Sequence, residues 1–354
     1  MDRARFIPTL QALAAAALFG ASAPFAKLLL SQVQPIPLAA LLYLGSGLGL
    51  TLIKVGSKAL KAPSSGEATI SGSDWLWVFG AVVSGGVFAP ILLLFSLSST
   101  PAATASLLLN FEAVATTMIA AVVFREAVGR RIGVSIACVT VASILLTRST
   151  GSQWGIAWGA LGVLAACSLW GIDNNLTRHV SGKNALDIVQ VKGLGAGSFS
   201  IILALMLGQT LPALPSASLA LLLGFLGYGL STVLFVTALR GLGAARTSAL
   251  YAAAPFVGVI IAFVIFQQIP DVTFLMALPV MIVGAVLLVG ERHAHSHIHL
   301  PEDHAHRYEP DTHHADPEAQ GAHPAAHSHA VTEHTHPHVP DIHHRHDHSD
   351  HGGR

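Results

Sequence analysis

An isolated acid in an apolar stretch is the first residue of this chain that could do chemistry. Glu112 lies within "TASLLLNFEAVATTMIAAVVF" (104–124), and a carboxylate surrounded by hydrocarbon is costly unless it faces a cavity, has a partner or is protonated. We therefore interpret Glu112, assisted by Asn110, as a candidate site for a coupling proton or a substrate. A packed, protonated Glu112 that donates to a neighbouring carbonyl is the alternative.

Further polar and aromatic residues occur in other apolar runs. Asp173 and Lys192 would either close a helix hairpin as a structural ion pair, which is the simpler interpretation, or form a cytoplasmic gate; Asn174 is adjacent. Lys27 would reach the outer interface by its long aliphatic stem, or take part in gating. Aromatic residues in membrane helices usually pack or mark interfaces, but three could line a cavity: Trp170, Tyr228 and Tyr251.

A dense series of histidines forms the second chemical feature. All but one of the 20 histidines follow Arg292, in H-x-H and H-H steps. Neutral imidazole binds Zn, Ni, Co and Cu(II), and irregular spacing predicts weak, overlapping sites whose affinity falls below about pH 6.5. The candidate ligands are His293, His295, His297, His299, His304, His306, His313, His314, His334, His336, His338, His343, His344, His346 and His348.

The composition of the chain is that of an integral membrane protein. Hydrophobic residues make up 52% of the sequence and charged residues only 11%, whereas soluble domains carry about a quarter charged residues. Cys138 and Cys167 lie inside apolar runs, which favours buried thiols over a disulfide. The first apolar run, from Phe6 to Ala26, is long enough for a retained span rather than a cleaved signal peptide.

Apolar runs that can cross a bilayer as helices of about 20 residues predict an all-α polytopic fold with ten transmembrane helices. Lys and Arg concentrate in the segments on one side, with Arg148 on the other, so we expect both termini to lie in the cytoplasm of a cell with the protein in its inner (plasma) membrane. The predicted helices are 7–30, 36–54, 75–97, 101–124, 131–148, 155–177, 186–207, 217–239, 245–266 and 271–290.

Two pairs of similar segments indicate an internal repeat. "LFGASAPFAK" (18–27) aligns with "LWGIDNNLTR" (169–178), and "TASLLLNFEAVATTMIAAVVFRE" (104–126) aligns without gaps with "RTSALYAAAPFVGVIIAFVIFQQ" (246–268). Five helices per half would invert the second half relative to the first. Inverted repeats are typical of secondary transporters whose substrate site lies between the halves.

The repeated motif "LFGASAPFAK"/"LWGIDNNLTR" and the segment "FREAVGRRIGVSIACVTVASILL" (124–146) resemble those of the drug/metabolite transporter superfamily, EamA type, over about residues 9–290. The resemblance implies ten helices and a gradient-driven carrier of small metabolites, often an exporter. The chain departs from the family pattern at "NFEAV" (110–114), which lacks the proline that the ninth helix keeps as Pro255, at "FQQIP", which lacks a glutamate, and in its histidine tail.

These observations predict three parts: a first five-helix repeat (1–148), a second inverted repeat (149–292) and a disordered cytoplasmic tail (293–354). The predicted function is secondary active transport, in the direction of export, of a small metabolite or drug-like solute, with a metal-binding regulatory tail and no enzymatic activity. The alternatives are an exporter of Ni, Co or Zn whose tail collects the cargo, a tail without a metal role, and a membrane-anchored metal store. Expected partners are the lipid bilayer, a small-molecule substrate and transition-metal ions, with no nucleic acid, in a monomer or homodimer.

Overall fold

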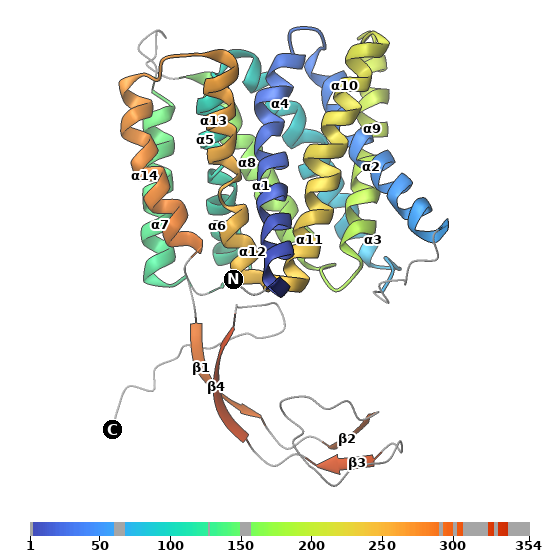
Figure 1. The fold of residues 1–354 in the computed structure, drawn as a ribbon, viewed down its shortest axis with the longest axis vertical. Helices are drawn as coiled ribbons and strands as arrows, with labels where there is room; N and C mark the ends of the chain where they lie inside the picture. The colour runs from blue at the N-terminus through green and yellow to red at the C-terminus, as the bar shows by residue number, and fades with distance from the viewer. Residues whose placement is uncertain are drawn as a thin grey trace. The chain divides into compact units, whose positions relative to one another are not determined.

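The computed structural model describes residues 3–59, 68–126, 128–148 and 157–289, together with the backbone of four strands within 293–338. The chain divides into two compact units, Met1–Glu291 and Arg292–Arg354. In its described residues the first unit is helical (Figure 1). Its helices are α1 (Arg3–Leu29), α2 (Pro35–Ala59), α3 (Asp74–Ala81), η1 (Val82–Phe88), α4 (Ala89–Ser99), α5 (Ala102–Leu108), α6 (Phe111–Val123), α7 (Arg130–Leu146), α8 (Trp158–Arg178), α9 (Ala185–Met206), α10 (Leu214–Gly224), η2 (Phe225–Leu230), α11 (Ser231–Leu242), α12 (Ala244–Tyr251), α13 (Ala254–Phe266) and α14 (Val272–Val289).

Each range predicted from the sequence as a transmembrane helix contains helix in the structure. Several of them are interrupted, so that α3, η1 and α4 form one continuous segment, as do α10, η2 and α11. Among the described residues, 7 helices are long and apolar enough to cross a membrane, and Val272–Leu288 is a shorter apolar helix. The protein is therefore a multi-pass membrane protein.

The packing of the helices joins the two halves of the first unit. The helix α1 lies between α11 and α13, whereas α8 packs against α4 and α6 (Figure 1). The pairs α2–α9 and α7–α14 each combine one helix from either half. In the sequence alignment of the halves, α1 corresponds to α8, so each of these two equivalent helices packs mainly against the other half.

Interruptions recur at equivalent positions in the two halves. The π-helical turns η1 (Val82–Phe88) and η2 (Phe225–Leu230) occupy corresponding segments. The break between α5 and α6 corresponds to the break between α12 and α13, because the alignment places Asn110 opposite Ala252. Local backbone departures are therefore repeated even where the side chains differ, as expected if they belong to the architecture of the repeat.

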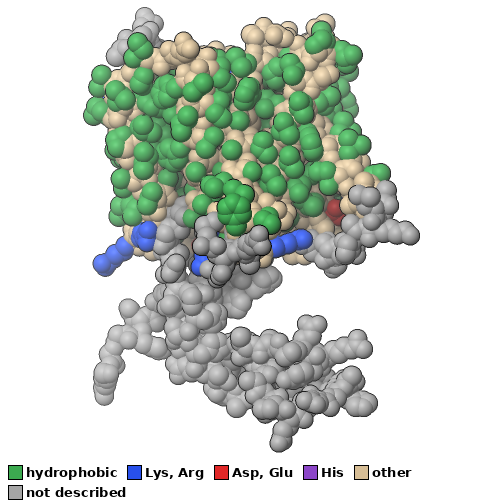
Figure 2. Space-filling view, in the orientation of Figure 1, with side chains coloured by type: hydrophobic (Ala, Val, Ile, Leu, Met, Phe, Trp, Pro, Cys, Tyr) green, Lys and Arg blue, Asp and Glu red, His purple; other side chains and the backbone are tan. Residues whose placement is uncertain are grey.

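The outer surface of the first unit is apolar. Large hydrophobic side chains such as Leu52, Met206 and Val264 are more than two-thirds exposed, and Figure 2 shows apolar side chains over the visible face, with Lys and Arg side chains gathered at one end. An apolar belt of this kind is stable only against lipid.

In the second unit, β1 (His293–His299) pairs antiparallel with β4 (Thr332–His338), and β2 (Asp303–His306) pairs with β3 (Ala325–Ser328). Alternation of histidine with other residues is compatible with the two-residue period of a strand. The sequence predicts disorder for this segment, and that expectation stays a prediction; apart from these four strands, the remainder of the segment lies outside the described residues. His313, His314, His343, His344, His346 and His348 belong to that remainder.

Candidate functional site

Glu112 lies midway along the segment formed by α5 and α6, just after the break between them. Its Oε1 accepts a hydrogen bond of 2.9 Å from Asn174 Nδ2 of α8, and the same amide donates to Thr116 Oγ1 over 3.1 Å. Asn174 is exposed and Glu112 is partly exposed, although both lie within helices of the apolar bundle. Accessible polar groups in such a bundle are typical of a substrate or ion pathway.

The break beside Glu112 is closed by Asn110. Its Nδ2 donates to Leu107 O over 2.9 Å, and its backbone N–H donates to the same carbonyl over 3.3 Å. The sequence predicts that Asn110 assists Glu112, but in the structure the amide binds its own helix while Asn174 binds the carboxylate. The assisting amide comes from the other half of the chain because only tertiary packing brings α8 against α6.

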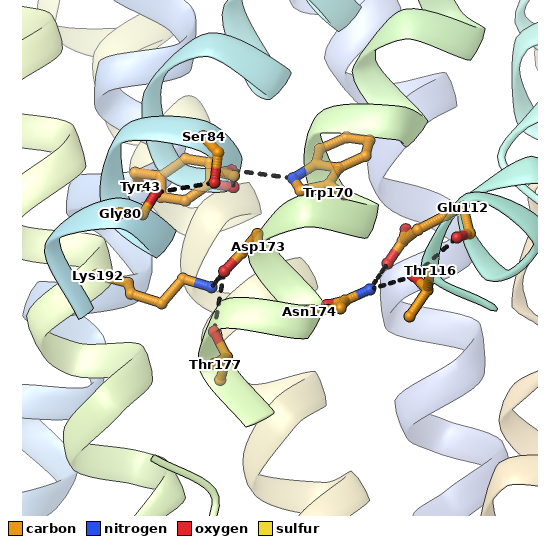
Figure 3. A network of polar contacts seen from close by, with 11 residues as sticks. Tyr43, Gly80, Ser84, Glu112, Thr116, Trp170, Asp173, Asn174, Thr177 and Lys192 are labelled. Carbon is orange, nitrogen blue, oxygen red and sulfur yellow. Dashed lines mark hydrogen bonds and ion pairs between the residues drawn. The ribbon is translucent and has the colours of Figure 1, made fainter. Parts of the chain in front are cut away.

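Asp173 and Lys192 form the ion pair that the sequence suggests. Lys192 Nζ lies 2.6 Å from both carboxylate oxygens of Asp173, and Thr177 Oγ1 donates to Asp173 Oδ1 over 2.9 Å. Asp173 is only 4% exposed, so the two charges compensate one another in a largely dry setting. Figure 3 shows Asp173 directed toward Lys192 and Asn174 directed toward Glu112 from neighbouring positions of α8.

The π-turn η1 presents a carbonyl to two side chains. Ala89 N–H donates to Ser84 O, and Pro90 has no N–H to donate, so Gly85 O loses its usual helical partners. Tyr43 Oη donates to Gly85 O over 2.7 Å, and Trp170 Nε1 donates to it over 2.9 Å (Figure 3). This carbonyl therefore links α2 and α8 to the middle of the third helical segment.

The second half satisfies the equivalent carbonyl differently. In η2, Ser231 N–H donates to Leu226 O, as Ala89 does to Ser84 O in η1. Gly227 O, the counterpart of Gly85 O, accepts from the hydroxyl of Ser231 in its own helix. Side chains of other helices therefore bind the carbonyl of η1, in the half that also contains Glu112, whereas the equivalent carbonyl of η2 binds a hydroxyl of its own segment.

Gly85 also leaves room for Asp173. A Cβ at Gly85 would lie 2.0 Å from Asp173 Oδ2 and 2.4 Å from its Cγ, which is far inside van der Waals contact. The carboxylate of Asp173 thus lies directly against the π-turn that binds Tyr43 and Trp170. The two predicted features, Asp173 and Trp170, belong to one connected arrangement.

Aromatic rings continue from Tyr43 across the bundle. Tyr43 stacks on Tyr228 with ring centroids 5.7 Å apart, Phe19 meets Tyr228 at 6.1 Å, and Phe19 lies 5.6 Å from Tyr251. Phe235 is 4.8 Å from Tyr251. The structure therefore brings together Tyr228 and Tyr251, which the sequence singles out as possible lining residues.

Sequence reasoning missed Phe19, Tyr43, Thr116 and Gly85. A signal for Phe19 was present, because "LFG" (18–20) aligns with "LWG" (169–171) and so pairs Phe19 with Trp170. The neighbouring glycines of these motifs make equivalent close contacts: a Cβ at Gly20 would meet Ala254 O at 2.1 Å, and one at Gly171 would meet Thr116 N at 2.9 Å. No comparable pattern marks Tyr43 or Gly85.

Lys27 is partly buried, and its aliphatic stem brings the ammonium group to the end of a neighbouring helix. Its Nζ donates to Leu97 O over 2.6 Å and to Thr100 O, which places the cation at the C-terminal end of α4, where the helix dipole and the last carbonyls favour it. Arg178, its counterpart in the repeat, forms an ion pair with Glu126. Both bases therefore fasten a helix to an adjacent connection.

A family model described as the EamA-like transporter family matches residues 7–148 and again residues 157–290. The chain belongs to the EamA-like transporter family. The two matches confirm the resemblance inferred from the repeated motifs, and they cover both halves of the membrane unit of this EamA-like transporter.

Two individual similarities agree with this assignment. An uncharacterized transporter of Methanothermobacter thermautotrophicus is 28% identical over 262 residues, which cover 71% of this EamA-like transporter and 76% of the relative. A solved crystal structure aligns with a TM-score of 0.56 at 18% identity, over 80% of this chain and 96% of the other. The structural match shows the fold alone.

Proposed function

We propose that this EamA-like transporter is a secondary active exporter of a small metabolite or drug-like solute. The observation that carries the proposal is the hydrogen bond between Glu112 and Asn174, which places a carboxylate and an amide together in an apolar bundle. The stacked rings of Tyr43 and Tyr228 lie on the same connected set of helices. A carboxylate, an amide and aromatic faces together suit an organic solute better than a bare metal ion.

The proposed transport cycle depends on the protonation of Glu112. In one state the Glu112 carboxylate accepts a hydrogen bond from Asn174, as in the structure. In the other state a proton or the solute would occupy the same carboxylate oxygen and displace Asn174. Because α8 also binds η1 through Trp170 and α9 through Asp173, a change at Glu112 can alter how α8 packs against its neighbours. Alternation of two inverted halves would then expose the site to either side of the membrane.

The proposed orientation puts the basic end of the bundle in the cytoplasm. Lys54, Arg178 and Lys183 all form ion pairs there with acids of neighbouring segments, and an excess of Lys and Arg on one side follows the positive-inside rule. Ten membrane crossings, of which the second five are inverted, would return the chain to the cytoplasm after α14. The histidine tail would then bind cytosolic Zn, Ni, Co or Cu and regulate the carrier.

The second candidate is an exporter of Ni, Co or Zn whose tail collects the cargo. It is favoured by the position of all but one of the 20 histidines after Arg292. In that mechanism Glu112 would be a metal ligand within the bundle, assisted by the oxygens of Asn174 and Thr116. The two candidates therefore assign different cargo to the same carboxylate.

Transport into everted membrane vesicles distinguishes the candidates. The proteins compared are the full chain, a form that ends at Arg292, and Glu112→Gln, with Thr117→Val as the matched control because its hydroxyl donates to Ala113 O in its own helix. The cargo panel contains radiolabelled nickel, zinc and small organic metabolites, with and without a proton gradient.

Under the main proposal, a metabolite accumulates with all forms except Glu112→Gln, and no form moves metal. Metal accumulation by the full and truncated chains, abolished by Glu112→Gln, would establish the second candidate instead. If a cargo accumulates with the full chain and equally with Glu112→Gln, the transport role of Glu112 is wrong.

A further inference from the structure

A cavity of about 660 Å³ lies away from Glu112, at the end of the bundle where α1 finishes. Lys27, in the last turn of α1, donates to Thr100 O, and Thr100 is one of the residues that line the cavity. Glu112 follows Pro101 by 11 residues, or roughly 16 Å of helix at the usual rise per residue. The cavity is therefore at the opposite end of the bundle from the start of α1, and separate from the Glu112–Asn174 contact.

The N-terminus of α8 opens toward this cavity. Ala157 is the N-cap residue of this 21-residue helix and provides no side-chain hydrogen bond to it, and both Ala157 and Ala160 line the cavity. The first N–H groups of a helix lack helical partners and carry the positive end of its dipole. An alanine N-cap leaves these groups to another acceptor.

The other long helix that starts at this cavity is capped. Asp271 Oδ1 accepts from Phe274 N over 2.7 Å and from Thr273 Oγ1 over 2.9 Å, so its negative charge serves the first turn of α14. Within the described part of the chain, no carboxylate caps the N-terminus of α8 in this way. The difference makes α8, not α14, the place where an external anion would be stabilised.

A buried hydroxyl points to the same place. Thr100 is 3% exposed, and its Oγ1 has no hydrogen-bond partner among the described residues. This oxygen lies against the first turn of α8, because a Cβ at Gly159 would be only 2.2 Å from it. An unpaired buried hydroxyl is destabilising, and a ligand that accepts a hydrogen bond from it would remove that cost.

Arg148 supplies a full positive charge at this cavity, and the hydroxyl residues Ser99 and Thr104 also line it. We propose that the cavity is an outer binding site for the carboxylate or phosphate group of the solute, held by Arg148, the Thr100 hydroxyl and the first turn of α8. The inference rests on the proposed transport function, since it assigns this site to the transported solute. It restricts the substrate class to solutes that carry an anionic group.

Equilibrium binding to the purified full chain tests this site directly. The probes are inorganic phosphate and acetate, each measured with the protein in nanodiscs of phosphatidylcholine and of phosphatidylglycerol. The variants are Arg148→Gln and Thr100→Val. The matched control is Thr147→Val, whose hydroxyl donates to Ile144 O, next to Arg148 in sequence.

We expect saturable binding of one probe in phosphatidylcholine. Loss of a charge-assisted contact should weaken it by about tenfold or more in Arg148→Gln, and loss of the hydroxyl by about fivefold in Thr100→Val, with Thr147→Val unchanged. Glu112→Gln should keep this binding while it loses transport, so failure of the transport mechanism and failure of the site are distinguishable.

Two results would overturn the proposal. One is the absence of saturable binding, or equal affinities in the full chain, Arg148→Gln and Thr100→Val. The other is complete competition by phosphatidylglycerol with no effect of Arg148→Gln on transport, which would assign the site to a lipid headgroup rather than to the solute.

Discussion

Asn174 Nδ2 lies 2.9 Å from Glu112 Oε1, and this hydrogen bond joins residues that are 62 positions apart in the chain. The amide belongs to α8 and the carboxylate to α6, so the contact crosses between the two halves that the family model matches separately. Asn174 Nδ2 also lies 3.1 Å from Thr116 Oγ1, whose hydroxyl donates to Glu112 O. One amide thus joins the Glu112 and Thr116 side chains of α6 to α8, beside a second hydrogen bond of 3.0 Å from Asn175 Nδ2 to Thr116 O.

Removal of that amide should impair transport more than folding. A hydrogen bond to a charged group contributes about 1.5–3 kcal/mol, so we expect Asn174→Ala to lower transport by about tenfold or more. Thr117→Val, on the same helix as Glu112, should leave it unchanged. Initial rates of metabolite transport, together with the amount of folded protein in the membrane, measure the effect; equal rates for Asn174→Ala and the unaltered chain would contradict it.

Gly85→Ala should destabilise the protein. The added methyl group would lie 2.0 Å from Asp173 Oδ2, and relief of that overlap requires movement of the helix or of a buried ion pair, at a cost of about 1–3 kcal/mol. Gly133→Ala is the matched control, because nothing lies within 4 Å of its added Cβ. Thermal unfolding in detergent should show a lower midpoint for Gly85→Ala alone, and similar midpoints for both variants would disprove the close contact.

The two donors to Gly85 O should behave as partial substitutes for one another. Tyr43→Phe and Trp170→Phe each leave one donor on this carbonyl, whereas the double variant leaves it unpaired, at a cost of about 1–3 kcal/mol. A double-mutant cycle on the free energy of unfolding should therefore give a loss larger than the sum of the single losses. Strict additivity would show that the two hydrogen bonds act independently.

The Asp173–Lys192 pair should distinguish a structural role from a gate. Lys192→Met leaves the carboxylate uncompensated, and loss of one partner of a buried pair costs about 3–5 kcal/mol. Lys192→Met combined with Asp173→Asn should recover most of the stability, since no charge remains. Normal transport by the stable double variant would indicate a structural pair, whereas a stable protein that leaks solute in both directions would indicate a gate.

The histidine tail should bind metal independently of transport. The full chain is expected to bind nickel or zinc at neutral pH and to release most of it well below pH 6.5 or so, because protonated imidazole cannot be a ligand. A form that ends at Arg292 should bind far less. Metal content after equilibrium dialysis measures both effects, and equal binding by the truncated form would place the metal sites elsewhere.

The sequence by itself determined the class and the repeat of this protein. Long charge-poor runs require helices that cross a bilayer, since lipid offers no partner to an exposed backbone, and the motif pair at 18–27 and 169–178 was sufficient to indicate the duplication and the family. Glu112 was also identifiable, because an acid in a run of apolar residues is conspicuous without any structure.

Only the tertiary structure decided which residues meet. Asn174, not the nearby Asn110, binds Glu112, because the packing of α8 on α6 brings this distant amide close. The amide of Asn110 instead donates to Leu107 O at the helix break. The partner of Lys27, the last carbonyls of α4, was likewise decided by packing. The carbonyl of Gly85 became available only through a π-turn followed by a proline. Such contacts depend on the relative placement of helices, which periodicity and composition do not specify.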